Sequence, residues 1–211
     1  MRVRFGRFKV GTGKRGSSTG ASLPIMVEMD QAGTSSPAAA PMGSTWGLKG
    51  NLVRVAWMLV GRTLLRLSTE RADGYRCWLL RRFGAKVGRG VQLARSCRVE
   101  IPWTLELADG VHVGERAILY SLGRIVVGEG TVISHFAHLC AGSHDYSKRR
   151  FDLLRPPITV GARCWIGPDA FVGPGVRVGD GAVLEARACL FKDAEPGKLY
   201  AGNPAKIVGD A

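Results

Sequence analysis

VGARCW, IGPDAF, VGPGVR, VGDGAV, LEARAC and LFKDAE follow one another without a gap from Val160 to Glu195. An aliphatic residue opens each of these hexapeptides, glycine usually follows it, and a small or β-branched residue stands fifth. An amphipathic helix repeats its apolar residues every three or four positions and a half-buried strand every two, so a period of six fits neither. The stretch is instead typical of a repeat architecture.

A three-sided coil accounts for this period. Each hexapeptide supplies one short strand and one corner, with the aliphatic side chain inside and glycine at a crowded or left-handed corner position. Three hexapeptides complete one turn, and neighbouring turns pair through backbone hydrogen bonds about 4.8 Å apart. Further hexapeptides of the same phase begin at Val87, Leu93, Val113, Val127 and Ile133. We therefore predict a coil over residues 87–195 with two interruptions.

Seven segments between about residues 45 and 208 resemble the hexapeptide-repeat acyltransferases, and within that family the colanic-acid-type acetyltransferases. The segments are LYSLG from Leu119, VIS from Val132, LCAGSHDY from Leu139, PITVG from Pro157, CWIG from Cys164, FVGPGV from Phe171 and AGNPAK from Ala201. The resemblance implies a mainly β chain that forms a left-handed parallel β-helix. The spacing alone does not give the left hand, because most parallel crossovers are right-handed.

The net charge of +13 is distributed unevenly along the chain. Residues 1–90 contain sixteen Lys and Arg against four Asp and Glu, a balance of +12, whereas residues 91–211 contain fourteen against thirteen, a balance of +1. We expect no nucleic-acid partner, because no recognised binding motif accompanies the charge. The basic N-terminal part is better suited to an anionic membrane surface or an anionic substrate.

Residues 1–44 read as a disordered basic tail with little to bury. Residues 45–86 are expected to form helices, one within 52–67 and a second within 71–83 that ends at Gly84. The first apolar run, with three arginines, is too short and too polar to span a bilayer. It is either a helical cap that closes the first strand edges of the coil or an interfacial helix near lipid-linked glycans.

The five cysteines contain no C-x-x-C pair, which argues against a disulfide framework or a zinc site. Cys97 and Cys164 stand fifth in their hexapeptides, where packing is the expected role. This usage suits a reducing cytoplasm. We expect the protein there, either free or at the inner face of the membrane. The remaining C-terminal residues, 196–211, read as a tail.

The repeat phase breaks over a loop at residues 145–157, and loops of this kind carry function. In the family that this chain resembles, the histidine at the mouth of the loop is the general base, and it corresponds to His144. A neutral imidazole can take a proton from a sugar hydroxyl that attacks a thioester directly, because its pKa lies near working pH. Asp145 is a candidate to fix the imidazole tautomer, and a backbone carbonyl is an equal alternative.

The thioester oxygen needs a hydrogen-bond donor as negative charge develops on it. The position that supplies an amide in the galactoside enzymes falls near Tyr120 here. The sequence therefore leaves three candidates open: the Tyr120 hydroxyl, the Ser121 hydroxyl and a backbone N–H.

Acetyl-CoA as co-substrate, without a metal, is implied by the resemblance. The residues that match coenzyme contacts by position are Pro168, Ala186, Phe191, Lys192 and Lys206, and Trp165 is expected beside the same groove or in a subunit contact. A second basic residue expected three positions after Lys206 is replaced by Gly209.

Three histidines, His112, His135 and His138, raise the alternative of a β-helical metalloenzyme of the carbonic anhydrase type. The spacings of three and six residues from His135 to His138 and on to His144 do not match the spacing of five in that family. We expect His135 and His138 to face outward, toward an acceptor groove or a subunit contact.

The sequence thus predicts an acetyl-CoA-dependent O-acetyltransferase for a saccharide, either an exopolysaccharide or a lipid-linked sugar, that works as a homotrimer. The alternative is a non-catalytic trimer that binds a sugar or nucleotide or serves as a scaffold. Lys148, Arg149, Arg150 and Arg155 make the loop basic. They suit an acidic acceptor, although a solvated basic loop is equally consistent with this composition.

Overall fold

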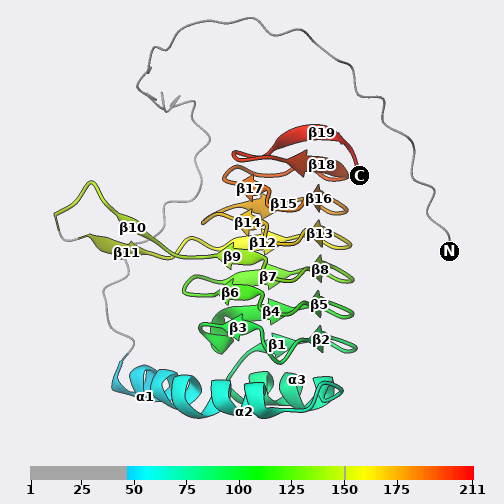
Figure 1. Cartoon of the computed structure of the whole chain (residues 1–211). Coiled ribbons are helices and arrows are strands. Elements are labelled where there is room, and N and C mark those ends of the chain that lie inside the picture. Colours follow the sequence, from blue (N-terminus) through cyan, green and yellow to red (C-terminus); the bar gives the residue numbers. More distant parts are fainter. Residues whose placement is uncertain (1–46, 150) are drawn as a thin grey trace, which may run out of the picture. The chain divides into compact units, whose positions relative to one another are not determined.

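The computed structural model describes residues 47–149 and 151–211, which belong to one compact unit. The expected disordered tail at residues 1–44 and the basic residue Arg150 lie outside the described residues. The described chain begins with helices and continues as a coil of short strands (Figure 1). The helices are α1 (Leu48–Ala56), a π-helical segment (Trp57–Gly61), α2 (Arg62–Leu67) and α3 (Asp73–Arg82).

Three parallel sheets form the sides of the coil. The first sheet contains β1 (Lys86–Val87), β4 (Leu105–Leu107), β7 (Ile125–Val127), β12 (Ile158–Val160) and β15 (Arg177–Val178). The second contains β2 (Gln92–Leu93), β5 (His112–Val113), β8 (Val132–Ile133), β13 (Trp165–Ile166), β16 (Val183–Leu184) and β18 (Lys198–Ala201). The third contains β3 (Arg98–Val99), β6 (Ile118–Tyr120), β9 (His138–Cys140), β14 (Phe171–Val172) and β17 (Cys189–Leu190). Successive turns of the coil add one strand to each sheet, which is the parallel β-helix that the hexapeptides predict.

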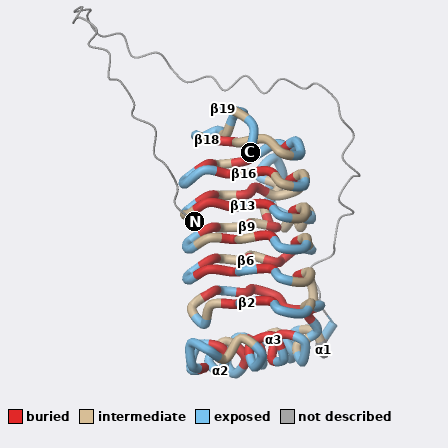
Figure 2. The backbone as a smooth tube through the Cα atoms, turned by 90° about the vertical axis from the view of Figure 1, so that its right-hand side faces the viewer, coloured by how far each residue is buried: buried red, intermediate tan, exposed pale blue. Residues whose placement is uncertain are grey.

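The core of the coil consists mainly of stacked aliphatic side chains. Buried residues recur in every turn of the coil (Figure 2). In the second sheet the register aligns Leu93, Val113, Ile133, Ile166 and Leu184, and none of them is more than 1% exposed. Burying such a side chain contributes about 2 kcal/mol. The first residue of each hexapeptide therefore points inward, as expected.

Glycine serves two different purposes in the repeat. At Gly167, the second position of its hexapeptide, a Cβ would lie 2.4 Å from the carbonyl oxygen of Leu184 in the next turn, so the close stacking of turns requires glycine. The left-handed corner is the fourth position, where Gly175 has φ +81°. Arg163 and Asp169 adopt positive φ at the same position, so the corner admits other residues at some cost in strain.

The helices pack on the first turn of the coil and act as its cap. Trp57 is fully buried, and its indole Nε1 donates to the Val99 carbonyl over 3.0 Å. The carboxylate of Asp73 accepts from the Leu93 amide at 2.9 Å, and Arg81 donates to the Val87 carbonyl at 2.9 Å. These bonds satisfy backbone groups on the open edge of the first turn, which is the role expected of a cap. Within the described residues no helix is long and apolar enough to cross a membrane.

Three boundaries differ from the sequence prediction. The segment 196–211 is not a tail, because β18 extends the second sheet and pairs in antiparallel fashion with β19 (Lys206–Asp210). The coil starts at Lys86, one residue earlier than expected. The loop that interrupts the coil also starts earlier, at Ser143, because β10 (Ser143–Asp145) and β11 (Asp152–Leu154) form an antiparallel hairpin that projects from the coil (Figure 1).

Candidate active site

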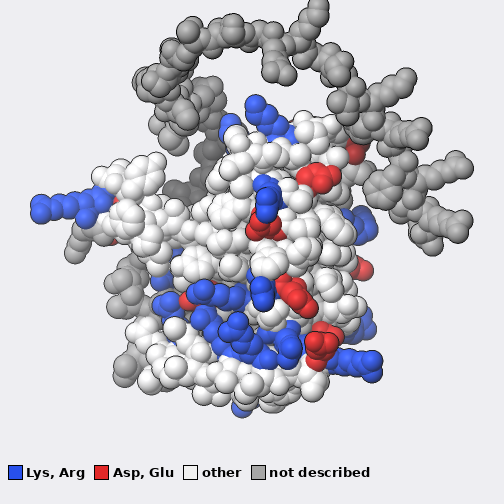
Figure 3. All heavy atoms as spheres, viewed as in Figure 1, with Lys and Arg blue, Asp and Glu red and all other residues white. Residues whose placement is uncertain are grey.

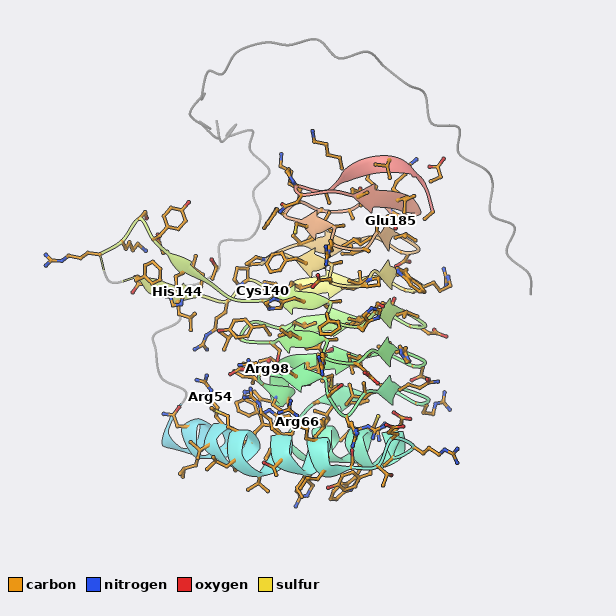
Figure 4. All side chains as sticks on the ribbon, in the orientation of Figure 1. Arg54, Arg66, Arg98, Cys140, His144 and Glu185 are labelled. Atoms are coloured by element: carbon orange, nitrogen blue, oxygen red, sulfur yellow. The ribbon has the colours of Figure 1, made fainter. Side chains whose placement is uncertain are left out.

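His144 lies on the projecting hairpin, where it pairs with Leu153 across the two strands (Figure 4). Its Nδ1 is 2.9 Å from the Phe151 carbonyl oxygen, and its ring stacks on the Phe151 ring at a centroid distance of 4.6 Å. A carbonyl only accepts, so Nδ1 must carry the proton in this contact. In the neutral form of the exposed His144 imidazole, this contact leaves Nε2 without a proton, which is the tautomer that a general base requires.

Asp145 does not supply this orientation. Its carboxylate accepts from the Ser147 amide at 3.1 Å and pairs with Lys148 at 3.1 Å. The hydrogen bond from the Ser147 hydroxyl contributes most to lowering the pKa of Asp145, followed by Lys148. These contacts close the turn of the hairpin. Of the two alternatives for fixing the His144 tautomer, the structure contains the backbone carbonyl.

Ser121 is also committed elsewhere. It is fully buried, its hydroxyl donates to the Ile101 carbonyl at 2.7 Å, and it accepts from the Ile101 amide at 2.9 Å. A hydroxyl has only one proton, so Ser121 has none left for an oxyanion. The prediction that the Ser121 hydroxyl could stabilise an oxyanion is therefore wrong. Ser121 instead joins one turn of the coil to the previous one. Tyr120 is half-buried at the end of β6, beside Cys140 on β9.

The sequence did not distinguish His138 from the other residues expected to face outward. It stands between two aromatic rings, 6.3 Å from Tyr120 and 5.3 Å from Phe171 by centroid distance. Its Nε2 is buried and has no hydrogen-bond partner among the described residues. Burial, followed by the positive charge of Arg98, lowers the pKa of His138, so the imidazole stays neutral near pH 7.

The three histidines of the metal alternative do not converge. His112 and His135 line one hollow on the second sheet together with Trp165, whereas His138 lies on the third sheet. No group of three His, Cys, Asp or Glu side chains in the described part of the chain is arranged to hold a metal ion.

The candidate coenzyme residues fall into two groups and one isolated residue. Pro168 and Ala186 line a hollow at the corner between the second and third sheets, and this hollow shares His135 with that of Trp165. Phe191 and Lys192 follow β17, with the Phe191 ring 5.6 Å from that of Phe171 on the third sheet. Lys206 begins β19 near the end of the chain, and its side chain is exposed.

One chain does not bring His144 to the corner hollow. Figure 4 labels His144 on the hairpin at one side of the coil and Glu185, the neighbour of Ala186, near the opposite side. His144 and the Pro168–Ala186 hollow are thus separate within one chain.

A cluster of arginines lies between the hairpin and the helices. Glu100 is 5% exposed, and its carboxylate contacts Arg62 at 2.6 Å, Arg98 at 3.2 Å and Arg54 at 3.5 Å. Burial by itself would raise the pKa of Glu100, but the neighbouring guanidinium groups lower it. Three positive charges against one negative charge leave this cluster basic, and basic side chains are prominent on this lower part of the face in Figure 3.

Arg155 directly follows β11, where the hairpin returns to the coil, and lies near this cluster. Burial, and then the charge of Arg54, lowers the pKa of Arg155, which places the two guanidinium groups within electrostatic reach of each other. Lys148 instead pairs with Asp145 within the hairpin. Of the basic loop residues, Arg155 therefore lies near the arginine cluster, whereas Lys148 is paired within the hairpin.

Known proteins with the same fold and similar sequence support a family assignment. The model of the bacterial transferase hexapeptide (six repeats) matches residues 157–192. The chain is 40% identical over 160 residues to the putative colanic acid biosynthesis acetyltransferase WcaF of Escherichia coli strain K12, covering 75% of this chain and 88% of that protein. The hexapeptide-repeat-containing acetyltransferase VCA0836 of Vibrio cholerae superposes with a TM-score of 0.72 at 20% identity, covering 78% of this chain and 94% of that one.

Two solved relatives contain a coenzyme. VCA0836 has been solved with acetyl coenzyme A, and a galactoside acetyltransferase in complex with coenzyme A superposes with a TM-score of 0.60 at 19% identity, covering 76% of this chain and 81% of that one. At such identities these structures establish the fold, a left-handed parallel β-helix with a short helical cap, as predicted. With the sequence identity to WcaF, this places the chain in the hexapeptide-repeat acyltransferase family.

Proposed function

We propose that this protein is an acetyl-CoA-dependent O-acetyltransferase that acts on a saccharide hydroxyl, with His144 as general base. The observation that carries the proposal is the contact between His144 Nδ1 and the Phe151 carbonyl, which leaves Nε2 ready to accept a proton. The names of the relatives support the reaction, since WcaF is a putative acetyltransferase and VCA0836 binds acetyl coenzyme A.

The reaction needs no covalent acyl-enzyme. Nε2 of His144 takes the proton of the sugar hydroxyl while the sugar oxygen bonds to the thioester carbonyl carbon. The tetrahedral intermediate then collapses, the carbon–sulfur bond breaks, and the thiolate of coenzyme A receives the proton from the imidazolium. With Ser121 engaged in the coil, the Tyr120 hydroxyl or a backbone N–H is left to stabilise the oxyanion.

The active site is shared between protomers of a homotrimer. His144 projects from one side of its own coil, and the hollow at Pro168 and Ala186 lies away from it, so the hairpin of one protomer would overhang the hollow of the next. Trp165 would then line the same intersubunit groove. Lys192 and Lys206 are exposed and would neutralise coenzyme phosphates.

The acceptor is expected to be anionic. The cluster of Arg54, Arg62 and Arg98 around Glu100 carries excess positive charge below the hairpin, on the same side as His144 in Figure 4. Guanidinium groups bind carboxylate and phosphate through paired hydrogen bonds. An acidic exopolysaccharide unit or a lipid-linked sugar has this chemistry. The five cysteines are free, which fits the cytoplasm, where acetyl-CoA is available.

The test measures release of free thiol from acetyl-CoA with a panel of oligosaccharides and lipid-linked sugars. Replacement of His144 by Ala should lower kcat by about 10²–10⁴-fold. Tyr146→Ala is the matched control, because Tyr146 is 79% exposed on the same hairpin, and it should retain activity. A protein that binds coenzyme A but releases no thiol with any acceptor, or a fully active His144→Ala variant, would contradict the proposal.

A further inference from the structure

The helical run of residues 52–67 exposes many apolar side chains in addition to those buried against the coil. Leu52 is 62% exposed, Leu59 69% and Leu67 77%. Val53, Val55, Met58, Val60 and Leu64 on the same helical run are also exposed. Isolated exposed leucines are ordinary on protein surfaces, but eight exposed apolar residues within a run of sixteen indicate an interaction surface.

Capping of the coil does not account for this surface. The cap is made by the inward residues Trp57, Leu65 and Leu80, each 3% exposed or less. A helix that only covered the end of the coil would be amphipathic, with polar residues on the outside. The outward leucines and valines therefore point to something that covers them.

Two aromatic side chains extend the exposed surface onto α3. Tyr75 and Trp78 stack with ring centroids 6.0 Å apart, and Trp78 is 54% exposed. Tyrosine and tryptophan are enriched where apolar and aqueous environments meet, because an apolar ring carries a polar group.

Charge decides what kind of partner fits. Residues 47–86 contain nine Lys and Arg against two Asp and Glu, a balance of +7. Exposed arginines at 66, 71 and 82 accompany the apolar side chains. A second copy of the chain would bring these exposed arginines close to arginines of the same charge, whereas an anionic lipid surface would attract each of them.

We propose that the outer face of the helices, made of the exposed apolar residues of 52–67 with Tyr75 and Trp78, docks on an anionic lipid bilayer. The apolar side chains enter the boundary between headgroups and acyl chains, and the surrounding arginines contact lipid phosphates. This binding is peripheral and independent of the acyl-transfer chemistry, so it can fail without affecting the proposed function.

The experiment measures co-sedimentation of the full-length protein with vesicles of equal parts phosphatidylcholine and phosphatidylglycerol, and with phosphatidylcholine vesicles. The wild type should bind the anionic vesicles more tightly. The double variant Leu59→Asp, Leu67→Asp should bind them at least about tenfold more weakly, since both apolar contacts are lost. The matched control is Val208→Asp, because Val208 is 60% exposed on β19 at the other end of the coil, and its binding should be unchanged.

A second variant tests the charge separately and leaves the apolar residues in place. Arg71→Glu with Arg82→Glu should also weaken binding to the anionic vesicles, and thermal melting by circular dichroism should show that both double variants are folded. Absence of vesicle binding by the wild type, or equal binding to both kinds of vesicle, would overturn the proposal. Self-association of the wild type beyond the trimer that the Leu59→Asp, Leu67→Asp variant abolishes, without vesicle binding, would assign the face to a second copy instead.

Discussion

Replacement of Glu100 by Gln should destabilise the protein far more than the same change at a surface ion pair. The Glu100 side chain is 7% exposed and holds Arg62 and Arg98 at 2.6 and 3.2 Å. Removing one partner of a buried ion pair costs about 3–5 kcal/mol, and the partial exposure of Arg98 favours the lower end. A loss of about 3 kcal/mol lowers Tm by roughly 6–12 °C for a chain of this size.

The matched control is Glu106→Gln. Glu106 pairs with Arg124 and Lys86, whose side chains are 58% and 76% exposed, so the loss should stay below about 1 kcal/mol. Because the pKa of Glu100 is lowered in the folded protein, its stabilisation is present above the ordinary glutamate pKa of about 4.3. That stabilisation disappears as the pH falls through the folded-state value, so the Tm difference between wild type and Glu100→Gln should shrink in acid. Equal Tm losses for the two variants at pH 7 would refute the reasoning.

Three further predictions concern single residues. Ser121→Ala should lose about 1–2 kcal/mol in thermal unfolding, because two Ile101 backbone groups lose their partner, and the folded fraction should keep its kcat. Gly167→Ala should lower the free energy of unfolding by about 2 kcal/mol, because the added Cβ clashes with the next turn. Gly74→Ala should not lower it in the same melting assay, because a Cβ at Gly74 meets no atom within 4 Å. Asp145→Asn should change kcat less than about tenfold in the thiol-release assay, since Phe151 orients His144; a loss as large as that of His144→Ala would show that the carboxylate is essential.

The coil could be predicted from the sequence because each strand and corner is determined by residues close together in the sequence. Each hexapeptide carries its own inward residue and corner, so the phase alone places Leu93, Val113 and Ile133 in the core. The helices were predictable as well, since apolar residues and a terminal glycine mark them. The β18–β19 hairpin was missed because its register is irregular and the repeat ends before it.

The site was only partly predictable because its contacts are distant in sequence. His144 could be assigned by resemblance, but its partner Phe151 is fixed only when β10 pairs with β11. The role of Ser121 depends on Ile101, twenty residues earlier and one turn below. The arginine cluster joins Arg62 to Glu100, residues that share no local pattern and meet only when the helices pack on the first turn.

Complementation between two inactive variants tests most directly the proposal that the active site is shared between protomers. The His144→Ala chain retains its corner hollow, and an Ala186→Trp chain, whose hollow is filled, retains its hairpin. If each site combines the hairpin of one protomer with the hollow of the next, mixed trimers made by co-refolding equal amounts should recover about one quarter of wild-type activity. Activity that stays at the level of the separate variants, in mixtures shown to contain mixed trimers, would contradict the account.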